Sequence, residues 1–244
     1  MKASSRKRAL KKIRTVAQKN LALFSNSLIY YPMENTKNIL SPFIPSDSER
    51  LNSQLQFTIE VDKMTQILRR TLLTDGSRRE NDAEHSWHIA LMCMLFAEYA
   101  DDPPNMNRSA VMCIVHDLIE IYAGDTFAFD KEANKNKEER EKLAADKLFS
   151  QLPDEQAKEI RGLWEEFDAM SSADAKFAAC MDRLQPFLHN TLTQGHTWVL
   201  SGANIKDVEE RMRPVKLYMP RLWQWVQKNI ENGTAKGWIK EGLK

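Results

Sequence analysis

The stretch CIVHDLIEIYAGDT, residues 113–126, is the part of the chain that most constrains its fold and chemistry. Apolar side chains recur through it at the spacing of a buried helix, yet His116 and Asp117 stand side by side in its middle. An unpaired carboxylate buried in such a helix costs several kcal/mol. Asp117 must therefore meet a cation, accept several hydrogen bonds or stay protonated.

Two further apolar segments carry polar groups in the same way. His85 comes shortly before the run IALMCMLFA, and Asp182 directly follows FAACM. Together with His116 and Asp117 they make two imidazoles and two carboxylates, a ligand set suited to zinc, manganese, iron or cobalt that leaves positions open for water or substrate. Each residue taken singly is more often a surface or a satisfied core group. The HExxH and paired CxxC zinc signatures are absent from the sequence, so spacing alone leaves the ligand assignment open.

Two carboxylates follow the His116–Asp117 pair. On a continuous helix over residues 107–122, Glu120 lies four residues after His116 and therefore on the same face, one turn further along. Asp125 comes just after Gly124, which we expect to end this helix. Both side chains are placed to act as acid and base beside a metal-bound water, although Glu120 could also be a solvated helix charge.

The periodicity of the chain predicts an all-α fold. Val61, Met64 and Leu68 repeat at helical spacing, strand alternation is absent, and Asn81 or Asp82 is expected to cap the helix that follows. Pro153 is expected to start a helix. These period rules give a bundle of about six to nine helices. The further segments expected to be helical are 107–122, 134–151, 154–170, 173–193, 205–213 and 220–231.

The 244 residues are enough for one large domain. We expect that domain to span 57–235, after a basic and irregular N-terminal extension over 1–56 and before a C-terminal tail over 236–244. Residues 1–33 contain no acidic residue, a composition typical of a targeting segment, an anion-binding arm or a surface tail. The composition changes at Met33, which could be an alternative start.

Charge and cysteine content limit the partners and the compartment. The 34 acidic and 35 basic residues nearly cancel, so the net charge calls for neither a nucleic-acid nor a membrane partner. The longest apolar run is far shorter than the roughly 20 residues needed to cross a bilayer. Cys93, Cys113 and Cys180 are odd in number and lie in apolar stretches, which favours reduced thiols and a cytoplasmic location.

Taken in order, ENDAEHSWHIA, IVHDLIEIYAGD and CMDRLQPF resemble the motifs of the HD-domain superfamily of metal-dependent phosphohydrolases, and more narrowly the small bacterial 5′-deoxynucleotidase group. The resemblance covers about residues 57–235 and implies a single helical HD domain. It implies that the ligands of the divalent ion are His85, His116, Asp117 and Asp182. It also implies that Glu120 and Asp125 serve catalysis around the attacking water, and that Arg70 grips the substrate phosphate.

Two departures from the family pattern matter. The residue after Arg70 is Thr71, where the deoxynucleotidases have a tryptophan that crowds the sugar, so a preference for 2′-deoxyribose is not implied. Dinuclear members of the superfamily have two more histidines between the HD pair and the last aspartate, and here there are none, so we expect one ion: manganese, cobalt, zinc or iron. Because members of the family often pair, a homodimer is compatible with the resemblance.

The sequence thus predicts a phosphomonoesterase that acts on a small phosphate substrate, best matched by a (deoxy)nucleoside 5′-monophosphate, through a metal-activated water. Three alternatives stay open at this stage. They are a triphosphohydrolase or phosphodiesterase on the same scaffold, a dinuclear iron oxygenase, and a regulatory module that binds metal and nucleotide without turnover.

Overall fold

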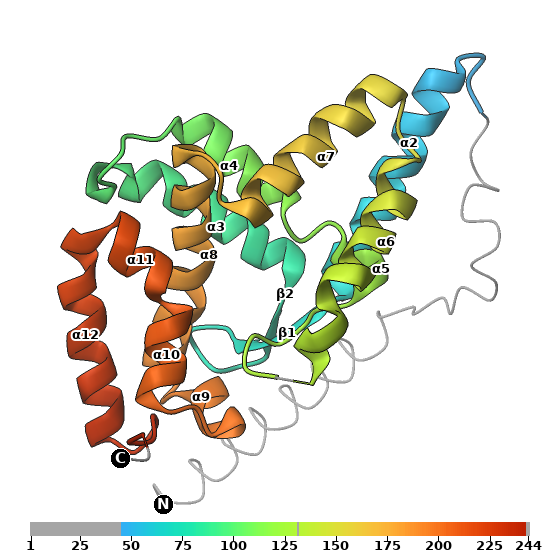
Figure 1. Cartoon of the computed structure of the whole chain (residues 1–244). Helices are drawn as coiled ribbons and strands as arrows, with labels where there is room; N and C mark the ends of the chain where they lie inside the picture. Colours follow the sequence, from blue (N-terminus) through green and yellow to red (C-terminus); the bar gives the residue numbers. More distant parts are fainter. Residues whose placement is uncertain (1–44, 131, 243–244) are drawn as a thin grey trace, which may run out of the picture. The chain divides into compact units, whose positions relative to one another are not determined.

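The computed structural model describes residues 45–130 and 132–242, and shows a bundle of helices with one small β-hairpin (Figure 1). The all-α prediction is therefore confirmed apart from this hairpin. In chain order the elements are α2 (Glu49–Val61), η2 (Asp62–Gln66), β1 (Leu68–Leu72), β2 (Arg79–Asn81), α3 (Asp82–Phe96), η3 (Ala97–Tyr99), α4 (Met106–Val115), α5 (Glu120–Ala123), η4 (Ala133–Asn136), α6 (Lys137–Phe149), α7 (Asp154–Ala169), α8 (Ala173–Leu192), α9 (His196–Ser201), α10 (Ile205–Arg211), α11 (Arg213–Tyr218) and α12 (Pro220–Ala235).

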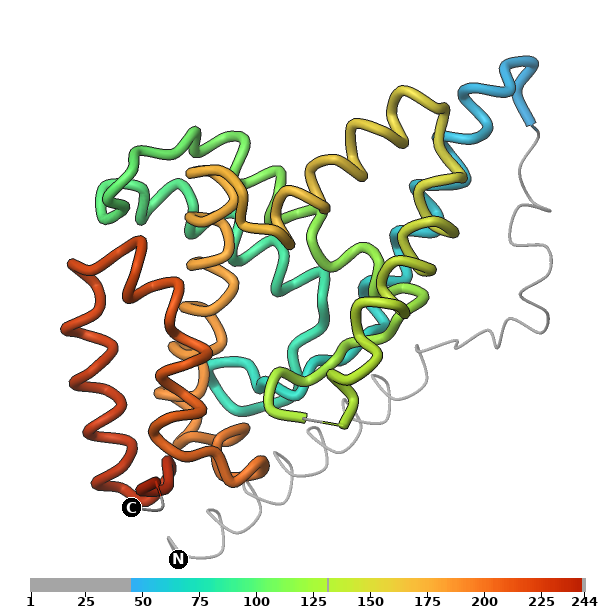
Figure 2. Tube along the Cα trace, viewed as in Figure 1, coloured from blue at the N-terminus to red at the C-terminus, as the bar shows by residue number. Residues whose placement is uncertain are grey.

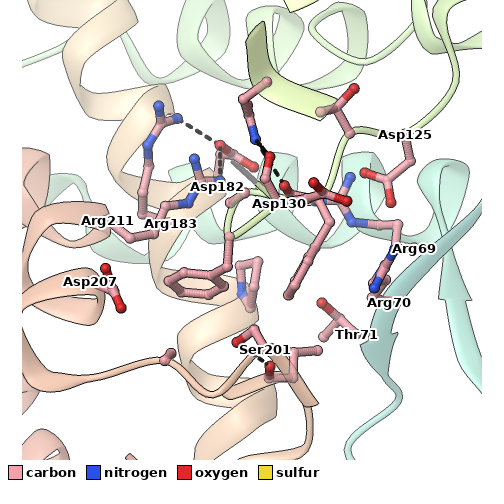
Figure 3. A pocket seen from close by; sticks show the side chains of 18 of the residues that line it. Arg69, Arg70, Thr71, Asp125, Asp130, Asp182, Arg183, Ser201, Asp207 and Arg211 are labelled. Carbon is pink, nitrogen blue, oxygen red and sulfur yellow. Dashed lines mark hydrogen bonds and ion pairs between the residues drawn. The ribbon is translucent and has the colours of Figure 1, made fainter. Parts of the chain in front are cut away.

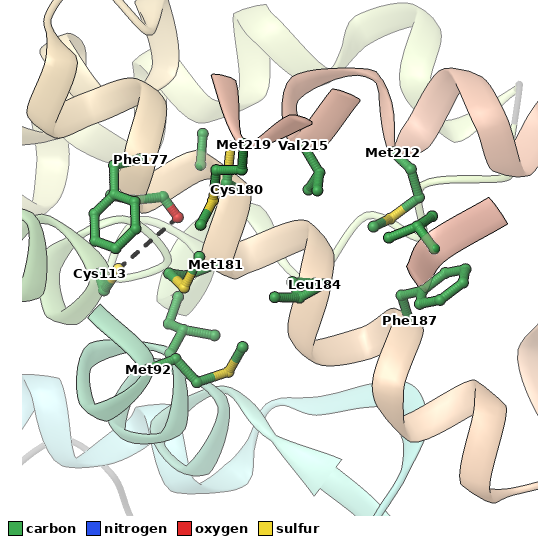
Figure 4. Close-up of a cluster of buried hydrophobic side chains, with 14 of the residues drawn as sticks. Met92, Cys113, Phe177, Cys180, Met181, Leu184, Phe187, Met212, Val215 and Met219 are labelled. Atoms are coloured by element: carbon green, nitrogen blue, oxygen red, sulfur yellow. Dashed lines mark hydrogen bonds between the residues drawn. The ribbon is translucent and has the colours of Figure 1, made fainter. Parts of the chain in front are cut away.

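The main core forms around the long helix α8. Helices α3, α4, α7 and α11 all pack against it, and the tube in Figure 2 shows how the C-terminal segments lie along it. Figure 4 shows the apolar side chains that fill the contact. Phe177, Cys180 and Met181 of α8 are fully buried there together with Met112 of α4 and Val215 of α11. Burial of this apolar surface is the main favourable term that holds the bundle together.

A second core lies under α5 and α6. Phe57 of α2 and Leu148 of α6 are buried there, and Leu118 and Ile119 from the segment after α4 pack into the same cluster. The HD dipeptide is thus followed directly by two buried apolar side chains. Their packing anchors the backbone on the C-terminal side of the site.

The hairpin contradicts the prediction that the chain has no strands. Strands β1 and β2 pair antiparallel, with Leu68 opposite Asn81 and Leu72 opposite Arg79. Leu68 is exposed rather than buried, because the chain becomes extended at Ile67 and the helical repeat from Val61 stops there. Strands of three and five residues are too short for their alternation to stand out in the sequence.

The helix predicted over 107–122 is also interrupted. Helix α4 ends at Val115, residues 116–119 form a turn, and the short α5 begins at Glu120. His116 is therefore the C-cap of α4. The stop at Gly124 is confirmed, since its φ of 76° lies in the left-handed region that glycine adopts without strain.

The ends of the domain differ from the predicted boundaries. Helix α2 begins at Glu49, inside the expected irregular segment, and Ser48 caps it. At the other end, Ile239 is buried and Asn204 pairs with Lys240, so the predicted tail packs onto the domain. The basic segment 1–33 and Met33 lie outside the described residues. Within the described ranges, no helix is long and apolar enough to span a membrane.

Core packing around α8 can be tested with a matched pair of isoleucines. Ile89 is fully buried on α3, whereas Ile114 on α4 is 52% exposed. We expect Ile89→Ala to lower the free energy of unfolding by about 2–5 kcal/mol, because it removes buried methylenes and leaves a cavity. The same change at Ile114 should cost less than about 1 kcal/mol. Urea unfolding followed by circular dichroism measures both, and equal losses would contradict the described packing.

Candidate metal centre

Four polar side chains from three separate segments meet beside one cavity, and His116, Asp117 and Asp182 line it. His85 lies in the first turn of α3, which starts at a capping box formed by Asn81 and Glu84. His116 and Asp117 follow α4 at the break in the predicted helix. Asp182 comes from the middle of α8. All four predicted ligands are less than a tenth exposed.

Their donor atoms lie close together. His85 Nε2 is 3.0 Å from Asp182 Oδ1, and His116 Nε2 is 3.1 Å from Asp117 Oδ1. The cross distances are 3.7 Å from His116 Nε2 to Asp182 Oδ1 and 3.9 Å from His85 Nε2 to Asp117 Oδ2. The structure thus brings together the four side chains that the sequence singled out, with both Nε2 atoms facing carboxylate oxygens.

The contacts of the two Nδ1 atoms indicate which ring nitrogen of each histidine carries the hydrogen. His116 Nδ1 lies 2.7 Å from the carbonyl oxygen of Cys113, and His85 Nδ1 lies 3.0 Å from Oε1 of Gln185. Both oxygens are acceptors, so in the neutral imidazole each Nδ1 carries the hydrogen and each Nε2 carries a lone pair. Among the described residues, His116 Nε2 has no hydrogen-bond partner although it is buried.

A lone pair that faces a carboxylate oxygen at this distance is repelled unless a cation lies between them. A divalent ion fits this donor set, since neutral imidazole and carboxylate are ordinary ligands of such ions. Without the ion a proton on His116 takes its place, while His85 stays neutral. Burial lowers the pKa of His116, but Asp117 and Asp182 outweigh that effect and raise it to about 10. Burial and the charge of Arg69 lower the pKa of His85 to about 4.

Arg69 is an important neighbour that the sequence analysis missed. Its Nη1 donates to Asp117 Oδ2 at 2.8 Å and to Asp82 Oδ1 at 3.2 Å. Asp82 is fully buried, and burial together with the charge of Asp117 raises its pKa to about 7. The sequence shows two consecutive arginines at 69 and 70, which indicated that one of them could contact a carboxylate. Only the extended backbone of β1 shows that Arg69 is the one that reaches the carboxylates.

A second layer of polar groups holds His85 in place. Gln185, one turn after Asp182, accepts from His85 Nδ1 and donates through Nε2 to Glu80 Oε1 at 2.5 Å. The same Nε2 lies 3.1 Å from His189 Nε2 and 3.3 Å from His88 Nδ1. Because Glu80 Oε1 and His189 Nε2 are acceptors, the amide turns its oxygen toward His85. The sequence pattern contained no signal for Glu80 or Gln185.

Glu120 and Asp125 lie beside the four predicted ligands. One oxygen each of Asp82, Asp117 and Glu120 lie within 4.8 Å of one another. Burial and the nearby charge of Asp117 raise the pKa of Glu120 well above its ordinary value, and burial raises the pKa of Asp125. Both carboxyls line the cavity that opens above the ligands.

The cavity has a volume of about 930 Å³, enough for a nucleotide. Figure 3 shows Arg69, Arg70 and Thr71 of β1 on one side of it and Asp182, Arg183 and Arg211 on the other. Arg70 lies over the ring of Phe127 at 4.9 Å from its centre. Phe127 and Phe129, whose ring centres are 5.5 Å apart, add an aromatic wall from the loop after Gly124.

Comparison with known proteins identifies the family of this chain. The model of the HD-domain family matches residues 61–223. The crystal structure of a predicted metal-dependent phosphohydrolase from Magnetospirillum magnetotacticum MS-1 is similar to this chain, with a TM-score of 0.75 and 46% sequence identity. The alignment covers 80% of this chain and 98% of that protein.

Curated relatives share a more specific name. The human 5′-deoxynucleotidase HDDC2 is 31% identical over 137 residues, which are 56% of this chain and 66% of the relative. The Xenopus laevis 5′-deoxynucleotidase HDDC2 is also 31% identical over 137 residues, which are 56% of this chain and 67% of that relative. The chain thus spans about two thirds of the length of these relatives.

The support that Gln185 gives to His85 can be tested by metal affinity. Gln185→Leu keeps the volume but removes the acceptor of His85 Nδ1, so the imidazole can rotate or change tautomer. We expect Mn²⁺ to bind about 10- to 100-fold more weakly, as is usual when the partner of a ligating histidine is lost. Titration calorimetry measures the affinity, with Gln224→Leu on the exposed side of α12 as the control. An unchanged affinity in a folded variant would contradict this role.

The buried carboxyl of Glu80 should make stability depend on pH. Burial raises its pKa from 4.5 to about 7, so the folded protein holds a proton that the unfolded chain has lost over this range. The free energy of unfolding of the metal-free wild type, relative to Glu80→Gln, should therefore fall by up to about 3 kcal/mol as pH rises from about 4.5 to 8. Urea unfolding at several pH values measures it. If the difference in free energy of unfolding between wild type and Glu80→Gln did not change with pH, the prediction would be refuted. The surface variant Glu98→Gln is the control and is expected to show no such change.

Proposed function

The chain belongs to the HD-domain family, and on that premise we propose that it is a metal-dependent phosphohydrolase, more narrowly a phosphomonoesterase acting on nucleoside or deoxynucleoside 5′-monophosphates. One observation carries the proposal. The Nε2 lone pairs of His85 and His116 point at the oxygens of Asp117 and Asp182, at the floor of a cavity large enough for a nucleotide. This arrangement is stable with a cation between the groups and unfavourable without one.

His85, His116, Asp117 and Asp182 would hold one divalent ion, of a type that the donor set alone does not distinguish among manganese, cobalt, zinc and iron. When bound, such an ion lowers the pKa of water and polarises a phosphoryl oxygen. Arg69 keeps Asp117 ionised and oriented, and Gln185 orients the neutral ring of His85. The protein therefore supplies a preorganised and largely buried set of charges.

Glu120 and Asp125 are assigned the proton transfers. A carboxyl whose pKa is raised by burial can hold and release a proton nearer neutral pH than an exposed one. The pKa values of Glu120 and Asp125 are both raised, and both side chains line the cavity together with Asp117. One of them would orient the attacking water while the other protonates the leaving alcohol. A protein that binds nucleotide without turnover has no need of both, which speaks against the regulatory alternative.

Arg70 and the aromatic wall support a nucleotide as the substrate. The guanidinium of Arg70 lines the cavity and can balance the charge of a phosphate. Phe127 and Phe129 offer faces on which a base can stack. Thr71 is buried at the cavity edge and is much smaller than a tryptophan, so we include both ribose and 2′-deoxyribose in the proposed substrate class. A cytoplasmic location and a homodimer stay predictions.

Two substitutions separate metal binding from turnover. We expect Asp117→Ala to lose bound metal and activity together, since it removes a ligand. Glu120→Gln should keep the metal but lower kcat about 10²- to 10⁴-fold, because the amide cannot transfer a proton. Metal content by mass spectrometry and phosphate release from a nucleoside monophosphate measure the two effects, with Glu138→Gln on the exposed face of α6 as the control. If Glu120→Gln kept full activity, the assigned role would be wrong.

The substrate class is tested by a panel of 5′-monophosphates, triphosphates and cyclic phosphodiesters with Mn²⁺-loaded protein. Release of inorganic phosphate from the monophosphates is the expected result. Release of triphosphate, or cleavage of the diesters alone, would move the protein to one of the alternative reactions on this scaffold. If no member of the panel reacted, the phosphohydrolase proposal would fail.

A further inference from the structure

Two arginines share one carboxylate on the cavity wall that faces Arg70. Arg183 Nη1 lies 2.6 Å from Asp182 Oδ2, and Arg211 Nη2 lies 3.3 Å from the same oxygen. Arg183 belongs to α8 and Arg211 is the last residue of α10. Figure 3 shows both guanidinium groups beside Asp182 at the cavity. Neither arginine had a role in the analysis of the sequence.

The two guanidinium groups on this wall depend on a single carboxylate. Within the described residues, Asp182 is the one carboxylate within 4 Å of either guanidinium, and its Oδ1 faces His85 and His116.

The two acids of α10 that line the cavity are engaged elsewhere. Asp207 accepts the backbone N–H of Asn204 in the capping box, and Glu210 lies 3.6 Å from Arg213. At least one guanidinium charge at Asp182 is therefore left without a carboxylate of its own. An anion that enters the cavity would compensate it.

The two arginines are partly shielded from water, which strengthens their attraction for an anion. The side chain of Arg183 is 18% exposed and that of Arg211 is 33% exposed, and both line the cavity. A charge-assisted hydrogen bond from such a group is stronger than one made in open solvent.

The position of the pair relative to the metal centre indicates which anion it takes. Asp182 turns Oδ1 toward the imidazoles and Oδ2 toward the arginines, so the guanidiniums lie one carboxylate away from the predicted ion. Arg70 contacts none of the four predicted ligands within hydrogen-bond distance and instead lies over Phe127. Arg69 also lines the cavity, but its Nη1 is shared by Asp117 and Asp82. On the wall opposite Arg70, the pair is thus the positive group placed beside an anion held at the metal centre.

We propose that Arg183 and Arg211 form an anion-binding subsite that receives the phosphoryl group of the substrate next to the metal centre. The subsite rests on the proposed function, because it names the groups that hold the reacting phosphate. Each guanidinium keeps one N–H on Asp182 and presents others to the phosphate oxygens, which is the forked geometry that arginine offers. Arg70 then adds a further positive charge from the opposite side of the cavity.

Binding of inorganic phosphate to the Mn²⁺-loaded protein tests the subsite without any turnover. Titration calorimetry gives the phosphate affinity, and a separate titration of metal-free protein gives the Mn²⁺ affinity. We expect Arg211→Gln and Arg183→Gln each to weaken phosphate binding about 10- to 100-fold while Mn²⁺ affinity changes little. Arg211→Lys, which keeps the charge, should fall between wild type and Arg211→Gln. Arg213→Gln, on an exposed neighbour, is the matched control.

Three results would overturn the subsite. They are a wild type that binds no phosphate, phosphate binding that is unchanged in both glutamine variants, and a loss of Mn²⁺ affinity that parallels the loss of phosphate, which would mean that the arginines only hold Asp182. Circular dichroism shows which variants are folded, and Arg211→Lys keeps the test decisive if a glutamine variant is not. A wild type that binds phosphate through the pair but hydrolyses no nucleotide would instead refute the proposed function.

Discussion

The constraint on which the structure depends is that two imidazole lone pairs face carboxylate oxygens in a buried place. Such an arrangement is repulsive by itself, and water is largely excluded from helping. It persists when a cation lies between the groups and when the Nδ1 atom of each imidazole has a partner. His85 and His116 meet the second condition through Gln185 and the carbonyl of Cys113. The first condition is why we propose a metal centre here.

The fold brings these groups together by interrupting regular structure where a continuous helix would fail. Side chains at consecutive helical positions diverge by about 100°, so His116 and Asp117 converge more easily because α4 ends between Val115 and His116. The chain then turns, buries Leu118 and Ile119, and restarts at Glu120. The hairpin contributes in a similar way, since its extended backbone lets Arg69 reach Asp117 from the opposite side.

Acidic, aromatic and basic side chains line different parts of the cavity around this centre. Carboxyls with raised pKa values lie beside Asp117, an aromatic wall follows Gly124, and guanidinium groups stand on two sides. This combination suits a substrate with an anionic end and a flat apolar end. The family match and the names of the relatives agree with it, because HD-domain proteins and 5′-deoxynucleotidases are what the chain is similar to.

The sequence by itself determined the helical class and the identity of the four converging residues. It could do so because periodicity and a polar group within an apolar run are local signals, readable within a few turns. The tertiary structure alone decided the partners of those residues. Gln185 lies 100 positions from His85, Arg69 lies 48 from Asp117, and Arg211 lies 29 from Asp182. No local pattern encodes such contacts, since they arise when separate elements pack on α8 and bury their polar groups against one another.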